Sequence, residues 1–271
     1  MNQIELDGKT AIVTGAARGI GAATARELSQ AGYQVVAVDA CLGDESHQLP
    51  GVNYPLGTEA DLREIERYGN GKIHSSVCDV RDAEALALIV QSAVERFGRL
   101  DVAVAAAAVI SGGKPMWNTP NEEFATLIDI DLLGVWNLAQ ACIPSMISSS
   151  EPQSCRFIAI ASAAGSHGLL HLAGYSAVKH GVIGLIKGIA ADLQGSGVSA
   201  CAISPGSTRT AMLDASAQIY NLDSAEEFVS SNLLNRLLEP SDIAQAIKFC
   251  CSQAGSALNG SVLDLSGGFR T

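Results

Sequence analysis

Short apolar segments alternate with longer amphipathic segments along this chain of 271 residues. The short segments are rich in β-branched and small residues, as buried strands are, and they span residues 10–13, 34–39, 72–77, 101–104, 156–161, 198–204 and 261–265. The segments between them repeat apolar residues at helical spacing. This alternation predicts an α/β fold, in which a doubly wound parallel sheet of about seven strands carries helices on both faces. Neither a repeat nor a linker divides the chain, so we expect a single domain over residues 1–271.

Capping residues and apolar periodicity locate several of the helices. We expect helices over residues 58–68, 82–97, 121–146 and 211–238. Thr58 and Asp82 are suitable N-caps because their side-chain oxygens can accept a free backbone N–H. Pro240 begins another helix, which we expect Ser241 to cap.

A glycine-rich turn, Thr14-Gly15-Ala16-Ala17-Arg18-Gly19-Ile20-Gly21, joins the first strand to the first helix. Strand, glycine turn and helix together form the context of a Rossmann-type dinucleotide site. Gly15 can make the tight turn, Gly19 lets the backbone approach a pyrophosphate, and Gly21 lets the helix pack close to the strand. The free N–H groups of the helix would then face the phosphates. The alternative is an ordinary glycine-rich connection.

Two carboxylates end strands at the edge of the sheet where ligands bind in such folds. Asp39 closes the second strand, near the spacing expected for a carboxylate that holds the adenosine ribose, and it would repel a 2′-phosphate. We therefore predict NAD rather than NADP as cofactor, although Arg18 is a cation that could reach a 2′-phosphate. Asp79, with Val80, is placed to flank the adenine. After the fourth strand, small residues such as Ala106 would let a planar ring lie close to the backbone.

Residues 41–72 are long for a connection in a compact domain. They begin beside the expected adenosine end of the cofactor. They are interpreted either as a lid over the cofactor or as a solvated insertion, and position alone slightly favours the second.

Composition excludes several classes of function. The net charge is −11 and no basic cluster occurs, which argues against binding nucleic acid or an anionic membrane. No apolar run is expected to span a membrane, and the segment Met1–Glu5 has no basic-then-apolar leader. Seven scattered cysteines indicate buried free thiols in a reducing compartment, not disulfides or a metal site. Cys250-Cys251 is interpreted as helix packing, and we expect a cytoplasmic protein.

The candidate chemistry lies after the fifth strand. Tyr175 and Lys179 are four residues apart, so they share one face of a helix. An ammonium there can lower the pKa of a phenol from about 10 toward neutrality, and the phenolate could take a proton from an alcohol while hydride leaves the carbon. Ser162, at the end of the strand, could hold the substrate oxygen. Asp131 lies within an apolar run, and a buried Asp must be paired or neutralised.

These motifs resemble the short-chain dehydrogenase/reductase family over nearly the whole chain. The resemblance rests on residues 14–21, Asp39, Asp79-Val80, Ser162, Tyr175-x-x-x-Lys179 and Pro205-Gly206. It implies NAD(P)-dependent interconversion of an alcohol and a ketone. Tyr175 is then the acid/base, Ser162 the partner of the substrate oxygen, and Lys179 a ribose contact that modifies the phenol pKa. Pro205 and Gly206 with Thr208 and Thr210 would lie by the nicotinamide.

Two positions depart from that family pattern. The Asn-Asn-Ala-Gly of the family is Ala105-Ala106-Ala107-Ala108 here, so the bracing from side-chain amides must come from elsewhere. The fourth catalytic residue of the family, an Asn, aligns with Asp131. A carboxylate accepts hydrogen bonds but donates one only when protonated, which disfavours a proton relay from Lys179 through water.

A narrower resemblance is to the mycofactocin-coupled subgroup of that family. It rests on residues 105–113, 115–117, 134–139, 171–175 and 204–210, and the insertion at 41–72 also fits. It implies tightly held NAD(H) that the redox cofactor mycofactocin re-oxidises in place. The family likeness also implies a homotetramer.

Several further interpretations remain open. Residues 207–236, with Met212, Leu213 and Tyr220, form a candidate lid that favours a hydrophobic secondary alcohol. His167 and His171 flank the expected pocket and are interpreted as loop histidines rather than substrate contacts. We expect the two tryptophans, at positions 117 and 136, in the core or at an interface. The alternative functions are a freely exchanging NAD(P)H ketoreductase and a catalytically silent NAD-binding protein.

Overall fold

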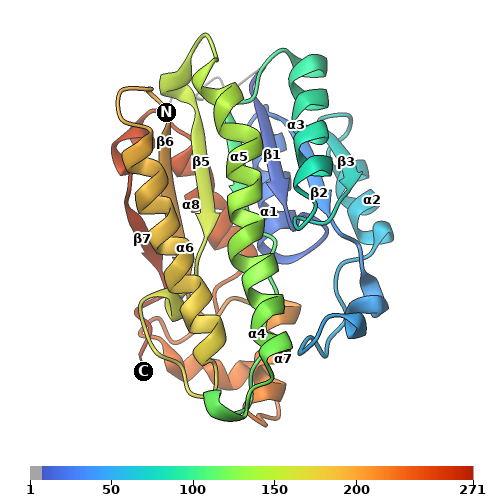
Figure 1. Cartoon of the computed structure of the whole chain (residues 1–271), viewed down its shortest axis with the longest axis vertical. Helices are drawn as coiled ribbons and strands as arrows, with labels where there is room; N and C mark the ends of the chain where they lie inside the picture. The colour runs from blue at the N-terminus through green and yellow to red at the C-terminus, as the bar shows by residue number, and fades with distance from the viewer. Residues whose placement is uncertain (1–7, 271) are drawn as a thin grey trace.

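The computed structural model describes residues 8–270, with only the backbone described at residues 44, 46 and 47. The segment Met1–Glu5, where no leader is expected, lies outside these residues. Seven strands form one sheet in the order β3-β2-β1-β4-β5-β6-β7, and every pair is parallel (Figure 1). The strands are β1 (Thr10–Thr14), β2 (Gln34–Asp39), β3 (Ile73–Val77), β4 (Val102–Ala105), β5 (Arg156–Ile160), β6 (Ser199–Pro205) and β7 (Val262–Leu265). The predicted doubly wound sheet is confirmed.

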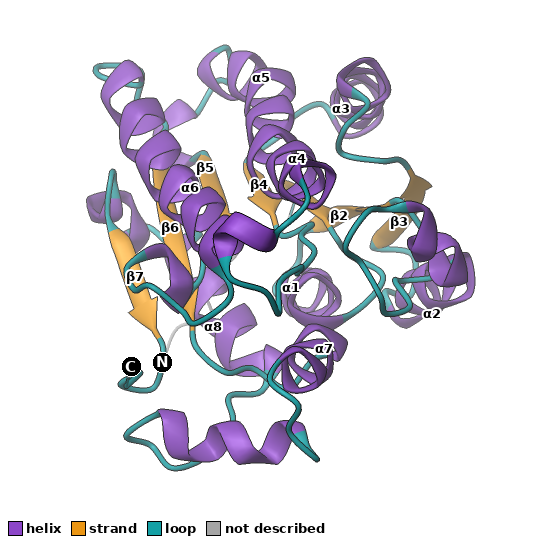
Figure 2. Ribbon diagram, turned by 60° about the horizontal axis from the view of Figure 1, so that its bottom comes forward, coloured by secondary structure: helices purple, strands orange, loops and turns teal. Residues whose placement is uncertain are grey.

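Helices cover both faces of this sheet, as Figure 2 shows. They are α1 (Gly19–Gln30), α2 (Glu59–Tyr68), α3 (Ala83–Phe97), α4 (Asn121–Leu127), α5 (Gly134–Ile147), α6 (Ala173–Asp192), α7 (Ala211–Ile219) and α8 (Pro240–Cys250). The core on one face includes residues of α3, α5 and α6, and the core on the other includes residues of α1, α2 and α8. Helix α7 lies at the carboxyl ends of the strands, at the bottom of Figure 1.

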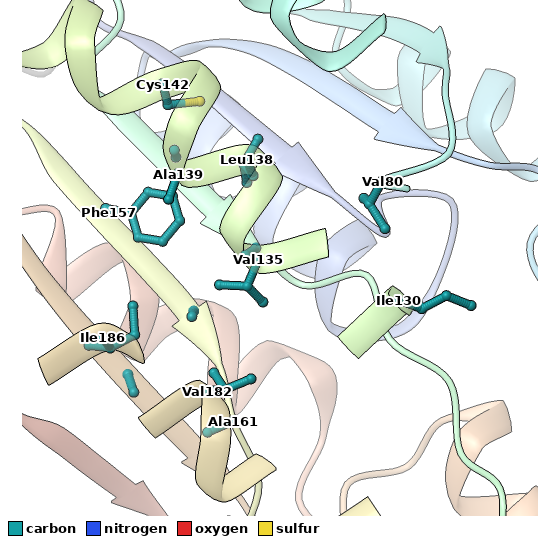
Figure 3. Packing of buried hydrophobic residues seen from close by; sticks show 14 of the residues in the cluster. Val80, Ile130, Val135, Leu138, Ala139, Cys142, Phe157, Ala161, Val182 and Ile186 are labelled. Carbon is teal, nitrogen blue, oxygen red and sulfur yellow. The ribbon is translucent and has the colours of Figure 1, made fainter. Parts of the chain in front are cut away.

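The packing of α5 and α6 on β5 illustrates the core (Figure 3). Val135 and Leu138 of α5 and Val182 of α6 are buried in the same cluster as Phe157 of β5. Burying one such side chain fully contributes about 1.5–3 kcal/mol. All seven cysteines are free and six are buried, which confirms the expectation of buried free thiols.

Two of the three predicted caps are confirmed. Thr58 and Asp82 accept the backbone N–H groups of Asp61 and Ala85. The N-cap of α8 is Glu239 rather than Ser241, so that prediction was wrong by two residues. The backbone N–H of Glu239 donates to the Asp242 carboxylate at 2.9 Å. Pro240 occupies the first helical turn, where its missing N–H costs no hydrogen bond.

The helix expected over 121–146 is interrupted by a π-helical segment, η3 (Ile128–Leu133), between α4 and α5. Such wide turns are rare and often occur at functional sites, and apolar periodicity does not reveal them. The helical stretch Asn121–Ile147 is long and apolar enough to cross a membrane, contrary to the expectation that no run reaches that length. Half of its most apolar window is buried inside the fold, as in the core helix of a globular protein.

The helical pattern expected over 211–238 is only partly borne out. Helix α7 ends at Ile219, and Asn221 takes a left-handed backbone with φ of 54°, which stops a helix. A short 3₁₀ helix, η6 (Ala225–Ser231), begins again at the N-cap Ser224. Leu238 then forms an isolated bridge with Thr208. Local turn residues therefore outweighed the apolar periodicity.

The two tryptophans do not lie in the core. The side chain of Trp117 is 79% exposed and that of Trp136 is 48% exposed. The expectation of a core position was wrong, and an interface remains a prediction.

Candidate active site

A cavity of about 930 Å³ lies at the carboxyl ends of the strands. It lies within the volume range of ligand pockets. Every predicted site residue except Asp131 lines it: Gly15, Arg18, Gly19, Ile20, Gly21, Asp39, Asp79, Val80, Ala106, Ser162, Tyr175, Lys179, Pro205, Gly206, Thr208 and Thr210. The sheet thus brings together residues that are up to about 200 positions apart in the sequence, because parallel strands end at one edge.

The glycine turn has the geometry that its sequence predicts. Gly15 has a φ of 66°, and a Cβ there would lie 2.7 Å from the Ala107 backbone. A Cβ at Gly21 would lie 2.0 Å from the carbonyl oxygen of Gly15. The N-cap of α1, Arg18, makes no side-chain capping bond, so the first N–H groups of the helix remain available to a phosphate. The turn therefore fits a dinucleotide.

Asp39 stands at the end of β2 with both oxygens engaged by backbone. Its carboxylate accepts N–H groups from Ala17 at 3.0 Å and Cys41 at 2.9 Å. These bonds fix its orientation beside the glycine turn, while it still lines the cavity. The fixed negative charge can accept hydroxyl hydrogens and disfavours a phosphate.

Asp79 forms a two-pronged ion pair with Arg81, with the shortest N–O distance 2.6 Å. Burial opposes ionisation, but the hydrogen bonds from Arg81 hold the pKa of Asp79 below its usual range. Val80 beside it lines the cavity, and its carbonyl accepts the side-chain amide of Asn137 at 2.9 Å.

Ser162, Tyr175 and Lys179 line the same part of the wall. Ser162 accepts the backbone N–H of Ala164 at 3.1 Å, which leaves its own O–H free to donate into the cavity. The ammonium of Lys179 lies 5.6 Å from the centre of the Tyr175 ring and 3.4 Å from the carbonyl oxygen of Ile160. The trio can therefore bind an oxygen and move a proton to or from it.

The expected lowering of the phenol pKa does not occur in the protein alone. Burial raises the pKa of Tyr175, and the charge of Lys179 and the hydrogen bond from Ser162 only partly oppose that rise. Asp131 adds to it. The prediction weighed the ammonium and omitted the burial and the nearby carboxylate.

Asp131 lies behind Lys179 and does not line the cavity. Its side chain is fully buried, with Oδ2 3.1 Å from the ammonium of Lys179. Oδ1 accepts the backbone N–H of Val109 at 2.9 Å. The buried Asp is thus paired, as expected, and it contacts Lys179 rather than the cavity.

The insertion packs over one end of the cavity. Leu42, Leu49, Tyr54 and Leu56 line it, and the hydroxyl of Tyr54 accepts the backbone N–H of Ile110 at 2.9 Å. Leu49 and Tyr54 are buried in the same core cluster as α5. A solvated insertion was therefore the wrong interpretation, and the segment forms a wall.

Apolar side chains surround the other end of the cavity. They come from three segments and comprise Leu169, Leu170, Leu172, Met212, Leu213, Tyr220 and Phe228. The Tyr220 hydroxyl donates to the carbonyl of Leu170 at 2.9 Å, and Met212 Sδ lies 3.9 Å from the Tyr175 hydroxyl. The candidate lid therefore reaches the hydroxyl of Tyr175.

Neither predicted flanking histidine lines the cavity. His167 Nδ1 lies 3.1 Å from the Ala163 carbonyl, and its ring packs on Phe269. His171 takes a left-handed backbone in the loop before α6. Both are loop histidines.

Known proteins are similar to this chain over almost its whole length. The family model described as Enoyl-(Acyl carrier protein) reductase matches residues 15–270. A (-)-trans-carveol dehydrogenase of Rhodococcus erythropolis is 31% identical, covering 97% of this chain and 98% of the relative. The chain belongs to the short-chain dehydrogenase/reductase family.

Two solved short-chain dehydrogenase/reductase structures share the fold. The carveol dehydrogenase of Mycobacterium avium in complex with NAD has a TM-score of 0.89 at 30% identity, with 97% of this chain and 98% of that one covered. A short chain dehydrogenase of Mycobacterium paratuberculosis bound to NAD has a TM-score of 0.86 at 29% identity, with the same coverage.

In this short-chain dehydrogenase/reductase, sequence reasoning missed Tyr54, Ile110 and Phe228 as individual wall residues. Tyr54 is an isolated aromatic in a polar, proline-containing loop, which was its one visible signal. The partner of its hydroxyl is a backbone amide 56 residues away, and no local pattern reveals that contact.

Proposed function

We propose that this protein is an NAD-dependent oxidoreductase that interconverts a hydrophobic secondary alcohol and its ketone. The observation that carries the proposal is that Ser162, Tyr175 and Lys179 line the same cavity as the glycine turn and Asp39. Two similar proteins are carveol dehydrogenases, and the one from Mycobacterium avium was crystallised with NAD.

The residues of the chain supply binding and proton transfer. Bound NAD would accept the hydride of the alcohol carbon, or return it. The free O–H of Ser162 donates to the substrate oxygen, which holds that carbon toward the cofactor. The Tyr175 phenolate takes the hydroxyl proton during oxidation, and the resulting phenol returns a proton during reduction. The ammonium of Lys179 lies beneath this phenol and stabilises its ionised form.

NAD is favoured over NADP by Asp39. Its two backbone hydrogen bonds hold the carboxylate in place, so a 2′-phosphate would meet a fixed negative charge. Arg18 is the one opposing feature, and its guanidinium lies 5.9 Å from the centre of the Tyr54 ring.

We further propose that the nucleotide is retained and recycled in place by mycofactocin. The support is the wall formed by the insertion, because Leu49, Tyr54 and Leu56 line the cavity and the neighbouring Gly57 packs against Asp39. A packed wall slows the escape of a ligand more than a mobile loop does. The competing possibility is that NAD(P)H exchanges freely with the solution during each turnover.

The test is to denature gently purified protein and identify what it releases by ultraviolet spectrum and mass. We expect one NAD or NADH per chain. Alcohol oxidation should then stop after one turnover unless an external electron acceptor is added. Absence of bound NAD together with many unaided turnovers on free NAD would exclude the retained-cofactor mode, and released NADP would overturn the choice of cofactor.

We also propose assembly into a homotetramer through the outer face of the helical stretch from α4 to α5. Phe124, Leu133 and Trp136 are large apolar residues exposed on it, and exposed apolar patches mark interaction sites. Sedimentation of wild type against Trp136→Glu tests this: a tetramer that the variant weakens is expected, and a wild-type monomer contradicts it.

A further inference from the structure

The active centre contains a buried ion pair whose members come from different elements. Asp131 lies in the π-helical segment η3 and Lys179 lies on α6. The two side chains are 0% and 2% exposed, and Oδ2 lies 3.1 Å from Nζ. Water therefore screens the attraction little, and the pair interacts more strongly than two charges at the surface would.

The two carboxylate oxygens have separate tasks. Oδ1 accepts the backbone N–H of Val109 from the loop after β4, which fixes the carboxylate. Oδ2 faces the ammonium of Lys179, which also approaches the Ile160 carbonyl at 3.4 Å. Burial lowers the pKa of Lys179, but the charge and hydrogen bond of Asp131 together with Tyr175 outweigh that effect, and the pKa is raised. The ammonium is therefore held charged and in one position.

Asp131 changes the net charge near Tyr175, which an uncharged amide at the same position would not do. An Asn in its place could still accept from Lys179 and donate or accept a hydrogen bond. It would leave one positive charge beside the Tyr175 ring, whereas Asp131 brings the sum of the two charges to zero.

We propose that Asp131 is a positioning residue that anchors the Lys179 ammonium and opposes its field at Tyr175, so that it acts together with burial to keep the phenol protonated. The role in catalysis rests on the proposed function, but the electrostatic relationship does not. Alcohol oxidation, which needs the phenolate, should accordingly rise with pH well above neutrality.

The other groups that face Tyr175 do not replace this effect. Tyr54 on the insertion interacts with it, and burial keeps the pKa of the Tyr54 phenol above its usual value, so this neighbour stays neutral. Arg18, from the glycine turn, lies against the ring of Tyr54, so Tyr54 stands between Arg18 and Tyr175. Ser162, two residues after the end of β5, and Met212 on α7 are uncharged. Burial, Lys179 and Asp131 are therefore the main influences on the pKa of Tyr175.

The experiment titrates Tyr175 directly in the protein as purified. Tyrosine is labelled with ¹³C at Cζ, and the Tyr175 resonance is assigned by its loss in Tyr175→Phe. In wild type we expect this phenol to titrate above the range of an exposed tyrosine. In Asp131→Asn the midpoint should fall by about one pH unit or more. The pH profile of kcat/KM for oxidation should shift in the same direction.

Asp129→Asn is the matched control. It removes the same charge from the same π-helical segment, but its side chain is exposed, so the Tyr175 midpoint should not move. Ionisation of the Tyr175 phenol near neutrality in wild type would overturn the proposal. This measurement needs no substitution at Asp131 or Lys179. An unchanged Tyr175 midpoint in folded Asp131→Asn would overturn the proposal as well. This holds even if the midpoint is unchanged because Lys179 has lost its proton in the variant.

The resonance also separates this inference from the proposed function. If the titrations behave as expected but no alcohol is oxidised, the electrostatic role of Asp131 stands and the proposed reaction fails. If oxidation occurs while the phenol does not respond to Asp131→Asn, the reaction stands and this inference fails.

Discussion

The hydroxyl oxygen of Thr14 accepts the backbone N–H of Ala106 at 3.2 Å. It also accepts the N–H of Ala107 at 3.4 Å, so the last residue of β1 holds the loop that follows β4. The alanine run offers no side-chain amide that could brace this turn, and Thr14 braces it instead. Because the same loop approaches Gly15 closely, its position also shapes the cavity.

Thr14→Val should therefore destabilise the protein. Two partly buried N–H groups lose their acceptor, which costs about 1–3 kcal/mol of the free energy of unfolding. Urea denaturation measures the loss. Thr10→Val is the matched control on the same strand, because the buried Thr10 hydroxyl has no hydrogen-bond partner among residues 8–270. We expect Thr10→Val to be neutral or slightly stabilising, and an equal loss in both variants would refute the bracing role.

Asp39→Asn should weaken the preference for NAD over NADP. The amide keeps one acceptor oxygen but removes the charge that a 2′-phosphate meets, so the affinity ratio should fall by about tenfold or more, equivalent to about 1.4 kcal/mol. Equilibration with a mixture of NAD and NADP, followed by chromatography of the bound nucleotides, measures the ratio. Adding Arg18→Gln should reverse part of the gain in NADP. A ratio unaffected by Asp39→Asn would mean that another residue selects the cofactor.

The fold was predictable from the sequence because its strands are short runs of β-branched residues and its turns carry local signals. Gln34–Asp39 is a strand at the predicted bounds, and Thr58 caps the predicted helix. The π-helical segment at Ile128–Leu133 was not predictable, since apolar residues at α-helical spacing fit it equally well. The break after Ile219 was missed because Asn221 gives only a weak local signal.

The residues of the candidate site that lie at strand ends were predictable from the sequence. The properties of the site that depend on side-chain packing were less predictable. Gly15, Asp39 and Tyr175 could be placed because the ends of parallel strands share one edge. The pKa of Tyr175 could not be predicted from the sequence. The effect of Lys179 on it depends on how deeply both residues are buried and on the distance to Asp131. Such quantities come only from the tertiary structure.

Tyr175→Phe should abolish turnover while the nucleotide stays bound. The variant removes the proton donor and acceptor, and loss of general acid/base catalysis costs about 10²–10⁴ in rate. The fold should be preserved, because within the part of the chain that the structure describes, apart from Ser162, the hydroxyl meets only the weak acceptor Met212 Sδ at 3.9 Å. Single-turnover rates and the amount of nucleotide released on denaturation check both parts. Activity equal to wild type would end the assignment of Tyr175 as acid/base.

Tyr54→Phe should release the nucleotide faster without altering the chemical step. The Tyr54 hydroxyl is the acceptor for the Ile110 N–H, and Ile110 is buried. Its loss leaves a buried amide unsatisfied and loosens the insertion over the cavity by about 1–3 kcal/mol. At about 1.4 kcal/mol per factor of ten, the release rate should rise about tenfold or more when measured by dilution into excess labelled NAD.

Tyr68→Phe is the control for that measurement. Tyr68 also belongs to the inserted region, at the end of α2, but its ring is half-exposed and its hydroxyl contacts Gln30 on α1 outside the cavity. Its release rate should match wild type. If Tyr54→Phe also matches wild type, the hydrogen bond to Ile110 does not hold the wall closed, and retention of the nucleotide must depend on the apolar contacts of Leu49 and Leu56. If both variants release faster, the effect is a general loosening of the insertion and the specific role of Tyr54 is wrong.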